Sequence, residues 1–97
     1  MKLEFEWDDR KNAVNKMKHG VSFEEAIAVF SDPRRYEIYD GIHSIFEKRW
    51  IVIGLVGLKV LKVSFTEREN IIRIISARKT NKKDMEEYYY GYGSTNN

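Results

Sequence analysis

The segment Lys18-His19-Gly20-Val21-Ser22-Phe23-Glu24-Glu25-Ala26 joins the end of one predicted helix to the start of another. Gly20 supplies the left-handed residue that commonly ends a helix, and the basic residues just before it favour a helix C-terminus. Ser22 and Glu25 have the S-x-x-E spacing of a capping box, which begins a helix. Two consecutive helices are therefore predicted near the N-terminus.

The elements around this junction follow from the spacing of apolar residues. Residues 3–6 alternate apolar and acidic side chains, which is typical of a short strand, and Asp8 is a credible N-cap for a helix that ends near Lys18. The second helix is predicted over residues 23–30, because its apolar residues share one stripe. Asp32-Pro33 ends it.

After residue 33 the period changes to that of strands. Strands are predicted near residues 36–38 and over 50–56, 60–66 and 71–77, and a last helix from residue 80 or 81 to about 90. Helices and strands are segregated, which predicts an α+β fold with a mainly antiparallel sheet of about four strands, two N-terminal helices and one C-terminal helix. One domain is expected over residues 1–90, and a flexible polar tail over 91–97.

The composition excludes several protein classes. The chain has 97 residues and no Cys, so a disulfide scaffold and a thiolate metal site are excluded. The N-terminus has no apolar run like that of a signal peptide, and no stretch approaches the length of a membrane span. A soluble cytoplasmic protein without a membrane partner is expected.

Basic and acidic residues gather in different segments of the chain, although neither kind is in large excess. The net charge is only +2, but basic residues gather at 10–19 and 78–83 and acidic residues at 4–9 and 84–87. Separate clusters are compatible with a local phosphate-binding surface. Charge alone, however, favours an ordinary solvated surface.

Several well-known site motifs are missing. The sequence has no glycine-rich phosphate loop, no H-E-x-x-H and no G-x-S-x-G nucleophile motif. His19 and His43 lie far apart without ligand-like spacing around them, so neither a metal site nor a cofactor is expected.

What remains is a set of charged and aromatic residues at strand ends. Arg73 lies among isoleucines, where a charge is costly unless it is paired or faces a groove, and it could simply pair with a carboxylate such as Glu47. Strand alternation places Arg73 and Arg78 on opposite faces unless the strand twists or bulges. Trp50 and the tyrosines at 88–90 are equally typical of packing residues. The residues alone favour structural roles for all of them except Arg78, for which both interpretations stay open.

The chain resembles the BrnT family of toxins from toxin–antitoxin operons. The resemblance extends from Phe5 to Tyr88 and rests on pieces in a specific order and spacing. These are Phe5-x-Trp7-Asp8 with Lys11 and Asn15; Lys18-His19-Gly20-Val21 with Phe23, Ala26, Phe30 and Asp32; Glu47-x-Arg49 with Gly54; and Ile72-Arg73-Ile74-Ile75-Ser76-Ala77-Arg78-Lys79.

This resemblance implies a RelE-like fold and a ribonuclease that inhibits translation and growth. It also implies a BrnA-like antitoxin partner with a ribbon-helix-helix part, so that operator DNA is bound only indirectly, through the antitoxin. Cleavage of the RNA substrate then needs no metal ion, because the ribose 2′-hydroxyl is the nucleophile. The protein must orient the phosphate, stabilise its extra negative charge and move two protons.

Within that expectation, the planar guanidinium of Arg78 is assigned to the phosphate. The other predicted catalytic residues are Arg49 and Arg73 as assisting cations, Lys79 for phosphate binding or proton transfer, Glu47 as a general base or as an anchor for Arg49, and Tyr88. The predicted RNA-binding residues are Trp50 as a stacking surface, Lys62, Lys82, Lys83 and His19, which is also a weaker candidate for proton transfer.

Two other interpretations compete with a ribonuclease. One is a non-catalytic protein-interaction or nucleic-acid-binding module that acts as a co-repressor with a DNA-binding partner. The other is a structural domain whose strand-end arginines serve packing. RNA sequence preference, ribosome dependence, the identity of the general base and the stoichiometry of the antitoxin complex cannot be predicted from the sequence.

Overall fold

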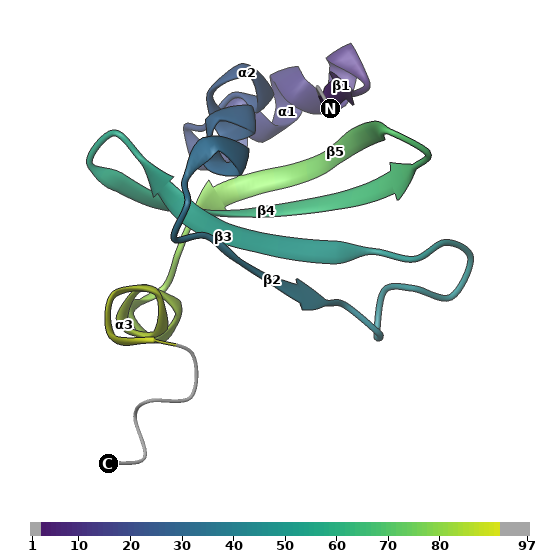
Figure 1. Cartoon of the computed structure of the whole chain (residues 1–97). Helices are drawn as coiled ribbons and strands as arrows, with labels where there is room; N and C mark the ends of the chain where they lie inside the picture. Colours follow the sequence, from purple (N-terminus) through teal and green to yellow (C-terminus); the bar gives the residue numbers. More distant parts are fainter. Residues whose placement is uncertain (1–2, 92–97) are drawn as a thin grey trace.

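The computed structural model describes residues 3–91, and they form a five-stranded sheet with helices on both faces (Figure 1). The strand order is β1-β5-β4-β3-β2. In chain order the elements are β1 (Glu4–Glu6), α1 (Asp9–His19), α2 (Phe23–Ala26), the 3₁₀ helix η1 (Ile27–Ser31), β2 (Tyr36–Tyr39), β3 (Trp50–Val56), β4 (Lys59–Arg68), β5 (Ile71–Lys79) and α3 (Lys82–Tyr90).

The α+β class is confirmed, whereas the predicted sheet of about four antiparallel strands is not matched in detail. Strands β2 to β5 pair antiparallel, but β1 adds a fifth strand that pairs parallel to β5 over three residues. The chain leaves β1 through two helices before the hairpins form, so β1 can reach the far edge of β5. The predicted tail over residues 91–97 lies outside the described residues except for Gly91.

The helix junction forms where the sequence predicts it. Gly20 ends α1 with φ +69° in the left-handed region, and its N–H donates to the Lys16 carbonyl. Ser22 Oγ accepts a hydrogen bond from the Glu25 N–H at 3.0 Å and begins α2. The Glu25 carboxylate pairs with Lys59 Nζ at 2.9 Å, which ties α2 to the start of β4.

The second helix is not the continuous α-helix predicted over residues 23–30. Its α-helical part ends at Ala26 and continues as η1. The Asp32 N–H donates to the Val29 carbonyl, three residues back, which tightens the last turn in the way that 3₁₀ geometry requires.

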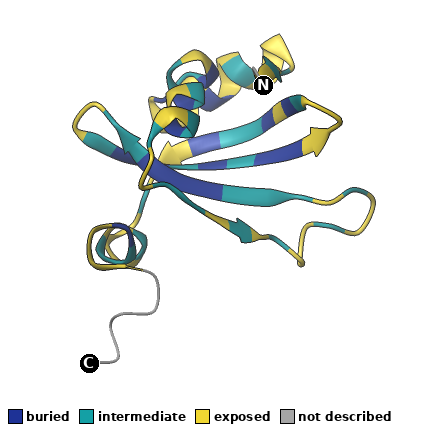
Figure 2. Cartoon of the chain, viewed as in Figure 1, coloured by how far each residue is buried: buried dark blue, intermediate teal, exposed yellow. Residues whose placement is uncertain are grey.

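Two apolar clusters lie on opposite faces of the sheet. Figure 2 shows buried residues along the central strands, in the N-terminal helices and in α3. The larger cluster packs α2 and η1 against β3, β4 and β5, and its buried members include Phe23, Val52, Val63 and Ile74. The smaller one lies on the other face, where Tyr88 of α3 packs against Ile53 and Val60. Helix α3 therefore covers only one end of the second face.

Among the described residues, no helix is long and apolar enough to cross a membrane.

A β-bulge in β5 changes which residues share a face. Ser76 pairs with Ser64 and Ile74 pairs with Phe65, so Ile75 has no direct partner on β4. Ile74 and Ala77 are both buried toward the helices despite their spacing of three. Arg73 and Arg78 consequently lie on the same open face, which corrects the alternation that would have separated them.

Candidate functional site

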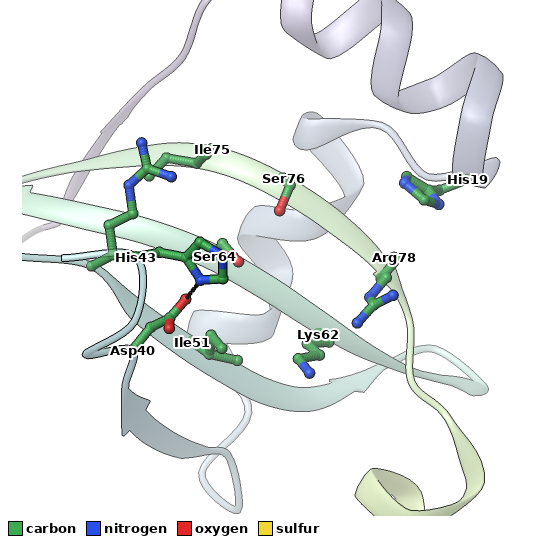
Figure 3. Close-up of a pocket in the computed structure, with 10 residues that line it drawn as sticks. His19, Asp40, His43, Ile51, Lys62, Ser64, Ile75, Ser76 and Arg78 are labelled. Carbon is green, nitrogen blue, oxygen red and sulfur yellow. Dashed lines mark hydrogen bonds and ion pairs between the residues drawn. The ribbon is translucent and has the colours of Figure 1, made fainter. Parts of the chain in front are cut away.

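The open face of the sheet carries a polar pocket beside α3. Its volume is about 340 Å³, and its walls come from β3, β4, β5, the end of α1 and the loop between β2 and β3 (Figure 3). The lining residues are His19, Asp40, His43, Arg49, Ile51, Lys62, Ser64, Ile75, Ser76 and Arg78.

Two cations on neighbouring strands form one end of the pocket. Lys62 of β4 and Arg78 of β5 are direct register partners and lie on the same face. Like charges directly opposite each other in an antiparallel pair destabilise the sheet, and their Cβ atoms are only about 5 Å apart. Ser64 and Ser76, the next pair on this face, add two hydroxyl groups. An anion between the strands would relieve the repulsion and accept hydrogen bonds from all four side chains.

The two cations are neutralised to different extents. Lys62 Nζ lies 3.4 Å from Asp84 Oδ2 at the start of α3, so its charge is partly balanced. Within residues 3–91, Arg78 forms no ion pair, and its side chain is exposed. Arg78 is therefore the cation most available to an incoming phosphate.

Arg49, the last residue of the loop before β3, contributes a third cation. Its guanidinium lies 3.7 Å from Glu47 Oε1, and its buried Nε has no hydrogen-bond partner in the structure. Glu47 Oε2 also lies 3.8 Å from Arg68, so the Glu47 carboxylate lies between two arginines. Glu47 itself does not line the pocket. Of the two roles predicted for Glu47, this geometry favours the orientation of Arg49.

The β2–β3 loop supplies a residue pair that sequence reasoning missed. His43 Nδ1 lies 2.8 Å from Asp40 Oδ2, and both residues line the pocket (Figure 3). From the sequence, His43 was considered only as a possible metal ligand, and no functional role was predicted for Asp40. The signal available in the sequence was the Asp40-x-x-His43 spacing, which allows the two side chains to meet within one loop.

His19 reaches the pocket from the helix layer. It is the last residue of α1, and Gly20 turns the chain away directly after it. Of the predicted site residues, the pocket thus brings together His19, Arg49, Lys62 and Arg78.

Arg73 lies on the same face as Arg78 but outside this pocket. Its guanidinium donates to Glu6 Oε2 of β1 at 2.9 Å, not to Glu47. It lines a separate hollow of about 300 Å³ together with Thr66, Arg68 and Glu69. Its pairing with β1 explains how a charge is accommodated among the isoleucines of β5.

Four further predicted residues also lie outside the pocket lining. Trp50 packs with the helix-side core, and its ring contacts Tyr39 with centroids 5.1 Å apart. Lys79 is exposed at the end of β5, opposite Leu61. Lys82 and Lys83 are exposed in the first turn of α3. The lysines lie near the site in sequence, whereas Trp50 fits the packing role that the sequence left open.

Tyr88 is buried and anchors α3 to the chain segment after η1. Its hydroxyl donates to Asp32 Oδ2, which also accepts the Leu55 N–H at 2.7 Å. Burial, followed by the hydrogen bond to Asp32, raises the pKa of Tyr88 to about 12. A phenol so placed is poorly suited to proton transfer, so we leave Tyr88 out of the proposed site.

The Asp32 carboxylate is held ionised in spite of its surroundings. Burial acts to raise its pKa, but hydrogen bonds from the Leu55 N–H, the Tyr88 hydroxyl and the Arg34 N–H outweigh burial and lower the pKa below its usual value. Gly54 permits this approach, because a Cβ there would lie 3.2 Å from Asp32 Oδ2 and 3.1 Å from Arg35 Cβ.

Within the described part of the chain, no group of three or more His, Cys, Asp or Glu side chains could hold a metal ion.

Comparison with protein families gives the site its context. Residues 7–84 match the family described as the ribonuclease toxin, BrnT, of type II toxin–antitoxin systems. The chain belongs to the BrnT family. The match spans α1 through the start of α3 and thus contains every residue that lines the pocket. The comparison with curated proteins gives no match. The family description makes the protein a ribonuclease toxin and implies an antitoxin partner.

Proposed function

We propose that this BrnT toxin is a metal-independent endoribonuclease whose active site is the pocket around Arg78. The observation that carries the proposal is the pair of directly opposed cations, Lys62 and Arg78, on the open face of the sheet. A cross-strand pair of like charges costs stability unless negative charge lies beside it, and Asp84 balances only Lys62. A phosphate of the RNA backbone has the charge and the geometry to bind there.

The pocket chemistry matches what RNA cleavage by the 2′-hydroxyl requires. In the transition state the phosphate gains negative charge, and the fork-shaped guanidinium of Arg78 can contact two of its oxygens. Arg49 lies on another wall of the same pocket and adds positive charge. The nucleophile belongs to the substrate, so the protein needs only to orient the phosphate, stabilise charge and move protons.

Regulation follows from the toxin–antitoxin context. The partner is proposed to be a BrnA-like antitoxin with a ribbon-helix-helix domain, through which the complex binds operator DNA. Cleavage of RNA by the free toxin would inhibit translation and growth, so the resting complex should cover the pocket.

The decisive experiment compares purified wild-type protein with Arg78→Ala on a labelled single-stranded RNA. The wild type should cleave in excess chelator and leave a 2′,3′-cyclic phosphate and a 5′-hydroxyl. Arg78→Ala should lower the rate about a hundredfold, as is typical when one transition-state contact is lost. Arg10→Ala, an exposed arginine on α1, is the matched control and should keep full activity.

Cleavage assays, together with growth and antitoxin-binding measurements on the same variants, separate the alternatives. Activity that is abolished by chelator and restored by a divalent cation would overturn the metal-independent mechanism. Growth inhibition by a folded Arg78→Ala protein at the wild-type level would remove Arg78 from the active site. A wild-type chain that binds its antitoxin but never cleaves RNA would favour the co-repressor module.

A further inference from the structure

The loop between β2 and β3 is held in place by polar bonds at its base. The Asp40 N–H donates to the Arg49 carbonyl at 2.9 Å, and the Arg49 N–H donates to Ser44 Oγ at 2.9 Å. Ser44 Oγ in turn donates to the Asp40 carbonyl at 2.5 Å. The loop therefore brings Asp40 and Arg49 side by side, although nine positions separate them.

Apolar packing cannot explain the conformation of this loop. Ile42, Ile45 and Phe46 are 83%, 80% and 99% exposed. The side chains that point toward the sheet are instead polar: Asp40, His43 and Arg49 line the pocket. The loop thus exposes its apolar residues while Asp40, His43 and Arg49 line the pocket, which is typical of a functional loop, since binding and catalytic residues often lie on loops.

The imidazole of His43 is oriented by Asp40. The Asp40 side chain is only 15% exposed, whereas the His43 side chain is 65% exposed. A carboxylate only accepts hydrogen bonds, so in the contact at 2.8 Å the ring proton lies on Nδ1, and in the neutral imidazole Nε2 then carries the lone pair that can accept a proton. Figure 3 shows His43 and Asp40 at one side of the pocket and His19 and Arg78 at the other.

We propose that His43 is the general base of the RNA cleavage reaction and that Asp40 is the positioning residue that orients it. This inference rests on the proposed function. The ionisable groups that share the pocket with His43 are Asp40 and Arg49 from its own loop, Lys62 from β4, Arg78 from β5 and His19 from α1. Within residues 3–91, the one hydrogen bond of the His43 ring goes to Asp40.

In the cleavage step one bond to phosphorus forms, one breaks, and His43 takes one proton. Nε2 of His43 takes the proton of the ribose 2′-hydroxyl, and O2′ forms a bond to phosphorus while the bond from phosphorus to O5′ breaks. The leaving O5′ takes a proton from water, and the imidazolium returns its proton to the solvent. Asp40 stabilises the positive charge that the ring carries between these events.

The test compares His43→Ala and His43→Gln with wild type on the same RNA, with and without added imidazole. A lost general base should lower kcat about a hundredfold or more, and imidazole should restore part of the rate to His43→Ala. Asp40→Asn should lower kcat with KM unchanged, because it changes the orientation of the ring and not the binding of RNA. His19→Ala, the other pocket histidine, should show no response to imidazole.

A substrate with sulfur in place of O5′ separates the base from the acid. Sulfur leaves without protonation, so a variant that lacks the acid regains its rate on this substrate and a variant that lacks the base does not. His43→Ala should remain slow. Wild-type rates in both His43 variants, or full recovery of His43→Ala on the sulfur substrate, would overturn the assignment and leave the ribonuclease proposal intact. Absence of cleavage by the wild type would overturn both.

Discussion

Asn15 completes the hydrogen bonding of β5 at the point where β1 ends. Strand β1 pairs with β5 only through Arg73, so the edge beyond this residue has no strand beside it. The buried Asn15 amide donates to the Ala77 carbonyl at 2.7 Å and to the Val21 carbonyl at 2.9 Å, and it accepts the Ala77 N–H at 3.2 Å. One side chain on α1 thus fixes the backbone next to Arg78.

Replacing Asn15 should therefore destabilise the fold more than an ordinary helix substitution does. Asn15→Ala leaves three buried backbone groups without partners, and each such group costs about 1–3 kcal/mol. We expect a loss of at least about 2 kcal/mol in urea unfolding. Lys16→Ala, at the next and exposed position of α1, should change stability by less than about 0.5 kcal/mol. Equal values for the two variants would show that water replaces the amide.

At the scale of elements, the sequence predicts local features better than pairing. Helix ends depend on single residues, and Asp8, Gly20, Ser22 and Asn81 all act as caps near the predicted boundaries. The bulge at Ile75 could not be predicted, because nothing in an isoleucine-rich run marks which residue loses its partner. The parallel pairing of β1 depends on the path of the intervening helices, which is a tertiary property.

In the candidate site too, some residues could be predicted from the sequence and others could not. Arg78, Lys62, Arg49 and His19 were predicted, because basic residues at strand and helix ends can be found along the chain. His43 was missed as a base because its role depends on the closed loop that joins it to Asp40. The predicted catalytic roles of Arg73 and Tyr88 could not be distinguished from structural roles until their partners, Glu6 and Asp32, were known.

The attachment of α3 to the sheet should respond to alkaline pH. The pKa of Tyr88 is raised from 10.0 to about 12, so the folded state keeps its proton in a range where the unfolded state loses it. The stabilisation is complete below pH 10 and is lost as pH rises from 10 toward 12. Urea unfolding at pH 9 and 11.5 should show this loss in wild type and less of it in Tyr88→Phe. An identical pH dependence in the two proteins would contradict the assignment.

At the scale of the whole molecule, the two faces of the sheet have different tasks. Helices α1, α2 and η1 cover one face and build the main core, while α3 lies on the other side of the sheet (Figure 1). The pocket opens on that second face, beside α3. The net charge of +2 does not reveal this division, because it sums the cations of the pocket with acidic residues over the whole chain. RNA and antitoxin should therefore respond to local charge on the pocket side and not to net charge.

Lys82 and Lys83 test this expectation. Both are exposed in the first turn of α3, next to the Asp84 that pairs with Lys62, and they lie outside the pocket lining. Charges at the rim of an interface act mainly on the association rate and its salt dependence. The double variant Lys82→Glu and Lys83→Glu should associate more slowly with the antitoxin and bind RNA more weakly, while its unfolding transition stays close to that of wild type.

The matched control changes Lys11 and Lys16 to Glu, which alters the net charge equally but on α1, in the helix layer. Association rates measured over a series of salt concentrations, with the antitoxin and with RNA as separate ligands, should fall for the α3 variant and much less for the α1 variant. The difference should shrink as salt is added, because surface charges are screened over about 10 Å at 0.1 M ionic strength. Unchanged rates for both ligands in the α3 variant would show that Lys82 and Lys83 belong only to a solvated surface. Equal slowing in the two variants would show that net charge, and not the pocket face, attracts the ligands.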